Sequence, residues 1–230
     1  MLRREPRAVL EVLVAARGGK RRSEIEGLCR RHGITIRSVS PASLDEGASR
    51  AVHNGFAARH RDRGVGTAKA LGDDQLRVLV EDVQDPRNLG ALIRVCEGAG
   101  VGHLLVRDRG SSPLTPAAAK TSAGASEWLP LERIVNSAQQ IEALKAEGYW
   151  VYGADAAGDP PWEVDLTGPV LLCLGGEQKG LRSRTRSLCD RLIGLPMRGR
   201  VESLNLATAA SALLYEALRQ RLTASTGAAG

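Results

Sequence analysis

Short apolar runs alternate along this chain with segments of helical periodicity, and this alternation predicts a mixed α/β protein. Residues 8–16 (AVLEVLVAA) form an apolar run that is typical of a buried strand. The pattern next predicts a helix over 23–33, a strand over 34–39, a helical turn over 41–47 and a strand over 56–59. These elements indicate a small α/β domain over residues 1–63.

The rest of the chain predicts a larger parallel α/β domain. We expect strands over 77–83, 103–106, 128–135, 150–153, 170–174 and 191–195. We expect helices from residue 89 to residue 98 or 100, and over 116–121, 136–147 and 181–189. Strands that alternate with helices indicate a parallel sheet with both faces covered. Residues 64–75 (GVGTAKALGDDQ) lack periodicity and predict a linker. The second domain is therefore expected over 76–222, with a flexible tail over 223–230.

A basic, glycine-containing loop precedes the longest amphipathic pattern of the chain. From Ser203 onward, apolar residues recur at spacings of three and four, which predicts one buried helical face, with Ser203 as the N-cap. Gly199 lies between Arg198 and Arg200 in the loop before it. Positive charge beside a helix N-terminus suits a polar or anionic ligand.

The net charge of +6 is concentrated at one end of the chain. Residues 1–66 contain 14 Lys and Arg against 7 Asp and Glu, and the remaining residues contain 18 against 19. A basic module joined to a near-neutral one is typical of a nucleic-acid-binding appendage, although a merely solvated basic surface is the alternative. The candidate RNA-binding residues of this module are Lys20, Arg21, Arg22, Arg30, Arg31, Arg59 and Arg61. With only seven aromatic residues in the chain, phosphate and shape contacts are favoured over base stacking.

Other classes of protein find little support in the sequence. It has no run of 18 uncharged apolar residues and no secretory pattern at its start, so we expect a cytoplasmic protein. The four cysteines, Cys29, Cys96, Cys173 and Cys189, have no CxxC spacing and no paired histidines. We interpret them as reduced thiols and expect no metal site.

Three predicted strands end in polar, glycine-bearing loops, at residues 80–94, 172–180 and 195–205. In a parallel sheet these loops would surround one crevice. Gly175 and Gly176 would allow close backbone approach to a ligand, and Glu177 would supply a fixed negative charge. The simpler alternative is that the glycines form a turn, that Asn88 and Ser203 are helix caps, and that Arg94 is a surface cation.

The same three segments resemble the SpoU/TrmH branch of the SPOUT RNA ribose methyltransferases. The NxGxxxR motif of that family is similar to residues 88–94 (NLGALIR), and its GxExxG motif to residues 175–180 (GGEQKG). Its [IL]PM and SLN[VL] motifs are similar to residues 195–197 (LPM) and 203–206 (SLNL). Residues 120–127 (KTSAGASE) also look like the family's sequence, whereas Ala207 stands where the family commonly has serine.

The resemblance implies a fold, a cofactor and roles for particular residues. The fold is a parallel-sheet SPOUT domain with a C-terminal trefoil knot, preceded by a small α/β RNA-binding domain, and the assembly is a homodimer. S-adenosylmethionine would be held by Gly175, Gly176, Leu195, Met197 and Leu204. The catalytic residues would be Arg94, Asn88, Glu177, Ser203 and Asn205, and Arg198 and Arg200 would face the RNA.

The expected reaction is methyl transfer from S-adenosylmethionine to a ribose 2′-hydroxyl, with a guanosine of large-subunit ribosomal RNA as the favoured substrate. A transfer-RNA substrate is one alternative, but that branch carries helical extensions where this chain has a basic α/β module. A non-catalytic RNA-binding protein of ribosome assembly is the other alternative. The intact motifs argue against it.

Overall fold

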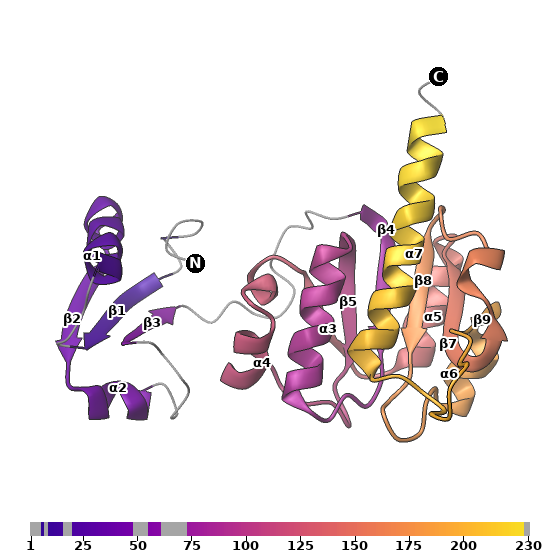
Figure 1. Cartoon of the computed structure of the whole chain (residues 1–230), viewed down its shortest axis with the longest axis horizontal. Coiled ribbons are helices and arrows are strands. Elements are labelled where there is room, and N and C mark those ends of the chain that lie inside the picture. Colours follow the sequence, from indigo (N-terminus) through magenta and orange to yellow (C-terminus); the bar gives the residue numbers. More distant parts are fainter. Residues whose placement is uncertain (1–5, 7–8, 16–19, 48–54, 61–72, 228–230) are drawn as a thin grey trace. The chain divides into compact units, whose positions relative to one another are not determined.

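The computed structural model describes residue 6 and residues 9–15, 20–47, 55–60 and 73–227. The chain divides into two compact units, Met1–Gly64 and Val65–Gly230 (Figure 1). The described residues contain no helix that is both long and apolar enough to cross a membrane.

The first unit is a three-stranded sheet with two helices. Its elements are β1 (Val9–Ala15), α1 (Lys20–His32), β2 (Thr35–Val39), α2 (Pro41–Gly47) and β3 (Phe56–His60). The strand order is β2-β1-β3, with β2 parallel and β3 antiparallel to β1. Val12 and Val14 of β1 pack with Cys29 of α1 in a small core. The predicted order of elements in this unit is therefore confirmed, although α1 begins three residues earlier than expected.

The second unit contains a six-stranded, wholly parallel sheet with the order β6-β5-β4-β8-β7-β9. Its strands are β4 (Asp73–Val80), β5 (Val101–Arg107), β6 (Leu131–Ile134), β7 (Trp150–Asp159), β8 (Val170–Leu174) and β9 (Arg191–Ile193). The predicted α/β class is confirmed. β4 and β8 lie side by side at the centre, where the strand order reverses, and such a switch point is where parallel sheets bind ligands.

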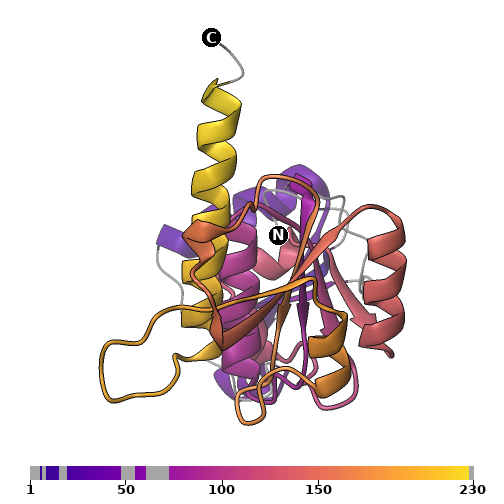
Figure 2. The same cartoon turned by 90° about the vertical axis from the view of Figure 1, so that its right-hand side faces the viewer.

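Helices cover both faces of this sheet (Figure 2). They are α3 (Pro86–Gly98), α4 (Pro116–Thr121), α5 (Ser137–Ala146), α6 (Ser183–Leu188) and α7 (Leu206–Gly227), with short 3₁₀ turns η2 (Ala125–Glu127) and η3 (Pro161–Glu163). Apolar residues of α3 and α7 pack with Val78 and Leu172 on one face. On the other face, α5 packs against Leu79 and Leu171. Neighbouring residues of one strand thus enter opposite cores, which explains the unbroken apolar runs in the sequence.

Several element boundaries differ from the sequence prediction. β4 stops at Val80 rather than at residue 83, because Asp82 has a positive φ of 51° that no extended strand accommodates. β7 continues to Asp159, six residues beyond its predicted end. At the other end of the chain, α7 continues to Gly227, so residues 223–227 are helical instead of belonging to a flexible tail.

Candidate active site

The loop after β8 is a tight, glycine-built turn. Gly176 and Gly180 exchange backbone hydrogen bonds of 3.1 and 2.9 Å, and Gly180 has a φ of +61°. A Cβ atom added to Gly175 would lie 2.0 Å from the carbonyl carbon of Gly180. Only glycine fits that position. The loop therefore has no side chain there, and a ligand could approach its backbone directly.

A cavity of about 330 Å³ lies at the carboxyl ends of β8 and β9, beside residues 154–156 of β7. Its volume falls within the range of small-molecule sites, roughly 300 to 1,000 Å³. The lining combines glycines and apolar side chains with polar residues such as Asp155, Gln178 and Glu202. All five residues expected to bind the cofactor line it: Gly175, Gly176, Leu195, Met197 and Leu204. Glu177 and Ser203 line it as well.

Beside the cavity, a chain of amide hydrogen bonds joins the three motif segments. The Asn88 Nδ2 group donates to Glu177 Oε1, and Asn88 Oδ1 accepts a 3.1 Å hydrogen bond from Asn205 Nδ2. Asn88 comes from the first turn of α3, Glu177 from the loop after β8, and Asn205 from the residue before α7. Three residues that are spread over 117 positions of the sequence therefore share one polar site.

The helix caps differ from the sequence prediction. Ser203 was expected to cap the last helix, but α7 begins at Leu206 and Asn205 Oδ1 accepts the Ala207 N–H at 3.0 Å. Asp85, not Asn88, caps α3 by accepting the Arg87 N–H at 2.7 Å. The side-chain hydrogen bond from Arg87, aided by this backbone N–H, lowers the pKa of Asp85. Ser203 and Asn88 are consequently free of capping, and both lie at the site.

Arg94 lies apart from this amide chain. Its side chain is exposed on α3 and makes no hydrogen bond or ion pair with any part of the chain that the structure describes. It follows Gly90 by one helical turn, and Gly90 packs directly against α4, since an added Cβ would lie 2.3 Å from the Ala118 carbonyl oxygen. Arg94 is therefore an available cation on α3, one turn after the residue at which α3 packs against α4.

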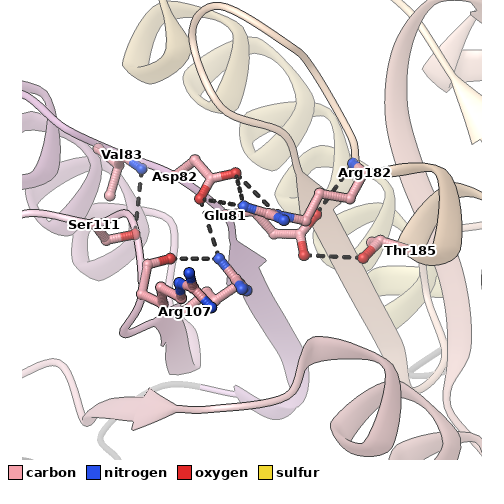
Figure 3. Close-up of polar contacts among 8 residues, drawn as sticks. Glu81, Asp82, Val83, Arg107, Ser111, Arg182 and Thr185 are labelled. Carbon is pink, nitrogen blue, oxygen red and sulfur yellow. Dashed lines mark hydrogen bonds and ion pairs between the residues drawn. The ribbon is translucent and has the colours of Figure 1, made fainter.

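A second polar cluster is not predicted from the sequence (Figure 3). Glu81 is fully buried and accepts hydrogen bonds from Thr185 Oγ1 at 3.0 Å and from the Arg182 backbone N–H at 3.3 Å. The Asp82 carboxylate accepts from Arg182 Nε and Nη2 at 3.0 and 2.9 Å, and from Arg107 Nη1 at 3.2 Å. The only signal of this cluster in the sequence is the pair of adjacent acidic residues, Glu81 and Asp82, directly after an apolar strand.

The candidate RNA-binding residues fall into distinct environments. Arg30 and Arg31 are exposed in the last turn of α1, and Arg198 and Arg200 are exposed in the loop before α7. Arg22 is paired with Glu26 at 2.7 Å, and Arg59 with Glu11 at 3.2 Å. Lys20 and Arg21 begin α1, and Arg61 lies outside the described residues.

The cysteines and acidic groups form no metal centre in the described part of the chain, where no three His, Cys, Asp or Glu side chains gather to hold an ion. All four cysteines are free thiols, of which Cys189 alone is partly exposed.

Family models match both units of the chain. Residues 75–215 match the SpoU rRNA Methylase family, and residues 1–62 match the RNA 2'-O ribose methyltransferase substrate binding family. Together these two models account for nearly the whole chain.

Curated proteins from several bacteria are similar to this chain over nearly their full length. The 23S rRNA (guanosine-2'-O-)-methyltransferase RlmB of Xanthomonas axonopodis pv. citri is 40% identical over 226 residues, covering 94% of this chain and 90% of that protein. The RlmB protein of Vibrio cholerae is 35% identical, covering 96% and 93%.

Solved structures share the fold. The SpoU methyltransferase AviRb from Streptomyces viridochromogenes in complex with the cofactor AdoMet has a TM-score of 0.80 at 26% identity, covering 94% of this chain and 84% of AviRb. The TrmH/SpoU tRNA modifying enzyme of A. aeolicus has a TM-score of 0.62 at 27% identity and covers 67% of this chain and 79% of that enzyme.

Proposed function

The chain belongs to the SpoU rRNA methylase family, and we propose that it transfers a methyl group from S-adenosylmethionine to a ribose 2′-hydroxyl of a guanosine in large-subunit ribosomal RNA. The observation that carries this proposal is the chain of hydrogen bonds Glu177–Asn88–Asn205, which joins all three motif segments beside the cavity that Glu177 lines. The names of the curated relatives supply the substrate class.

The cavity fits S-adenosylmethionine. Glycine backbone at Gly175 and Gly176 lets polar ligand groups approach the main chain, and Leu195, Met197 and Leu204 offer an apolar surface for the adenine ring. When bound, this cofactor supplies a methyl group activated on a sulfonium. We propose these five residues as its binding residues.

The reaction needs a poor nucleophile to be oriented and its proton to be handled. An arginine stays protonated, so we assign Arg94 to orient the RNA phosphate and to stabilise the developing alkoxide charge. Glu177, Asn88 and Asn205 form a preorganised polar chain beside the cavity. Ser203 at the cavity rim adds a hydroxyl that hydrogen-bonds the ribose in this proposal.

The proposal includes a homodimer and the trefoil knot implied by the resemblance. Arg94 has no partner within the described part of the chain and does not line the cavity, so a second copy would bring its arginine to the site. Tyr215 of α7 and Val201 in the preceding loop are exposed apolar side chains, 50% and 63% accessible, that suit burial against that copy.

RNA would be held by cations of both units. Arg30 and Arg31 supply unpaired charge in the first unit, and Arg198 and Arg200 do so beside the cavity. Because ribosomal RNA is made in the cytoplasm of bacteria such as those of the curated relatives, the proposal places the protein in that compartment.

The test of the proposal is a methylation assay with S-adenosylmethionine and large-subunit ribosomal RNA, followed by mapping of 2′-O-methyl positions. We expect one methylated guanosine, and Arg94→Ala should lower turnover by at least about 100-fold, as removal of a transition-state donor does. Glu97→Gln, on the same helix, is the matched control and should retain wild-type turnover. Methylation at a near wild-type rate by Arg94→Ala would show that its role is wrongly assigned.

Two further measurements separate the alternatives. A calorimetric titration that detects no S-adenosylmethionine binding would favour a non-catalytic assembly protein. Methylation of transfer RNA in preference to ribosomal RNA would favour the tRNA-modifying class, which is represented by the TrmH/SpoU tRNA modifying enzyme of A. aeolicus.

A further inference from the structure

Figure 3 shows the polar cluster of Glu81, Asp82, Thr185, Arg107 and Arg182. Arg182 follows the glycine loop at residues 175–180, which forms part of the cavity wall. We propose that the Asp82–Arg182 ion pair positions the glycine loop at residues 175–180 for cofactor binding and methyl transfer, an inference that rests on the function proposed above. These side chains do not line the cavity, so they would act through the loop rather than on a ligand.

The pair anchors the loop at its far end. Arg182 follows Gly180 by two residues, and its guanidinium makes a two-pronged contact with the Asp82 carboxylate, at 3.0 Å from Nε and 2.9 Å from Nη2. The Arg182 backbone N–H also donates to Glu81 Oε2 at 3.3 Å. A forked contact fixes orientation as well as distance, which a lysine could not do.

The near end of the loop is anchored against the same two acidic residues. A Cβ atom on Gly176 would lie 2.8 Å from Asp82 Cβ, 3.2 Å from the Asp82 carbonyl oxygen and 3.3 Å from that of Glu81. The Glu81 backbone N–H donates to the Leu174 carbonyl at 3.0 Å. Residues 81–82 therefore contact both ends of the loop. They pack against Gly176 at its start and pair with the charged side chain of Arg182 after its end.

The backbone at Asp82 is adapted to this task. Its φ of 51° lies in the left-handed region, which is unfavourable for a residue with a Cβ and persists only where the surroundings fix it. This conformation ends β4 and turns the carboxylate between Arg107 and Arg182. The Asp82 side chain is 20% accessible and the Arg182 side chain 47%, so the carboxylate is partly shielded from solvent while the guanidinium is half exposed.

The braced loop carries the groups on which the proposed chemistry depends. Gly175 and Gly176 form the cavity wall, and Glu177 accepts the hydrogen bond of Asn88, which in turn accepts from Asn205. A shift of the loop would move the wall and this amide chain together. Loss of the Asp82–Arg182 ion pair is therefore expected to lower both the affinity for the cofactor and the turnover. It should not change the affinity for RNA, which other residues bind.

The first variant is Arg182→Ala in the full-length protein, compared with Arg184→Ala. Arg184 makes an exposed ion pair with Glu142 at 2.9 Å, two residues along the same segment, and provides a matched control. For Arg182→Ala we expect roughly tenfold to hundredfold losses in kcat and in calorimetric affinity for S-adenosylmethionine, as misplacement of reacting groups produces. The KM for RNA should stay within about twofold of wild type. Arg184→Ala should match the wild type in all three quantities.

Conservative variants distinguish positioning from a general loss of fold. Arg182→Lys keeps the charge without the fork, and Asp82→Asn keeps the shape and tolerates the positive φ. Both should fold with wild-type melting temperatures and show intermediate losses. The double variant Asp82→Asn/Arg182→Lys should be no worse than the more severe single variant, because both changes disrupt the same Asp82–Arg182 contact and only Asp82→Asn also affects Arg107.

The outcomes separate this inference from the function on which it rests. If the wild type methylates RNA but the Arg182 and Asp82 variants behave like Arg184→Ala, the positioning role is overturned and the proposed function stands. Additive losses in the double variant, or an increase in the KM for RNA alone, would also overturn it. If the wild type neither binds S-adenosylmethionine nor methylates RNA, both proposals fail.

Discussion

Asn205 serves two purposes at once, and few other residue types could replace it. Its Oδ1 atom caps α7 through the Ala207 N–H, while its Nδ2 group donates to Asn88. An aspartate would keep the cap but lose the donor, and a serine would cap the helix without the same reach. The start of the last helix and the polar chain of the site are therefore fixed by the same amide.

Gly90 is a residue at which a single methyl group should matter. A Cβ there would lie 2.3 Å from the Ala118 carbonyl oxygen and 2.8 Å from Thr121 Cβ, so α3 and α4 would have to move apart. We expect Gly90→Ala to lower the free energy of unfolding by about 1 to 3 kcal/mol, as overpacking does. Denaturant titration measures this change.

Gly27 provides the control for that substitution. It lies within α1, and an added Cβ would meet nothing within 4 Å. Gly27→Ala should therefore stabilise its helix by about 0.5 to 1 kcal/mol, the usual gain from replacing a helical glycine. Equal stability of Gly90→Ala and wild type would contradict the tight α3–α4 packing.

Helix α7 contacts the rest of its unit through hydrogen bonds of polar side chains as well as through its apolar face. Gln220 donates to the Pro161 carbonyl at 3.1 Å and accepts from the Leu166 N–H at 2.9 Å. Glu216 accepts hydrogen bonds from both Arg219 and Gln220. One helix turn thus connects the last helix to the segment before β8.

This contact predicts an acid-dependent stability. The hydrogen bonds from Arg219, and next those from Gln220, lower the pKa of Glu216 to about 2. A depressed native pKa stabilises the fold above the ordinary glutamate pKa of about 4.3, and this contribution is lost as the pH falls toward 2. Glu216→Gln should lower the free energy of unfolding by at most about 1 kcal/mol at pH 7, and the difference should disappear near pH 2.

Denaturant titrations at several pH values check this expectation. Glu97→Gln is a suitable control, since the exposed Glu97 carboxylate has no hydrogen-bond or ion-pair partner in the described ranges. A Glu216→Gln difference that stays constant between pH 5 and pH 2 would contradict the assigned pairing.

For the whole molecule, the distribution of charge predicts how RNA binding depends on salt. The excess positive charge is concentrated in residues 1–66, and Arg30 and Arg31 are exposed there without ion pairs. Each cation that contacts a phosphate contributes about 0.7 to 0.9 to the slope of log K against log salt concentration. Replacing both arginines by glutamine should therefore reduce that slope by roughly 1.5.

Filter binding or fluorescence anisotropy across a salt series measures the slope. The charge-matched control is Arg184→Gln/Arg191→Gln, which removes two arginines already engaged with Glu142 and Asp159. We expect that control to change the slope less. Equal reductions would indicate that binding follows net charge rather than these two residues.

Much of the architecture could be read from local patterns. The apolar run at residues 170–174 and the helix at 116–121 coincide with β8 and α4 to the residue. Boundaries were missed where the deciding interaction is not local. The end of β4 depends on Asp82, whose positive φ is held by Arg182, a residue 100 positions away.

By itself, the sequence determined the class of fold, the order of the elements and the identity of the motif residues, because periodicity and short motifs depend on neighbours along the chain. Tertiary structure alone decided how those residues meet. It placed Asn88 between Glu177 and Asn205 and gave the capping of α7 to Asn205. It also brought Thr185 and Arg182 into contact with Glu81 and Asp82. Such contacts join strand ends far apart in sequence, and no local pattern records them.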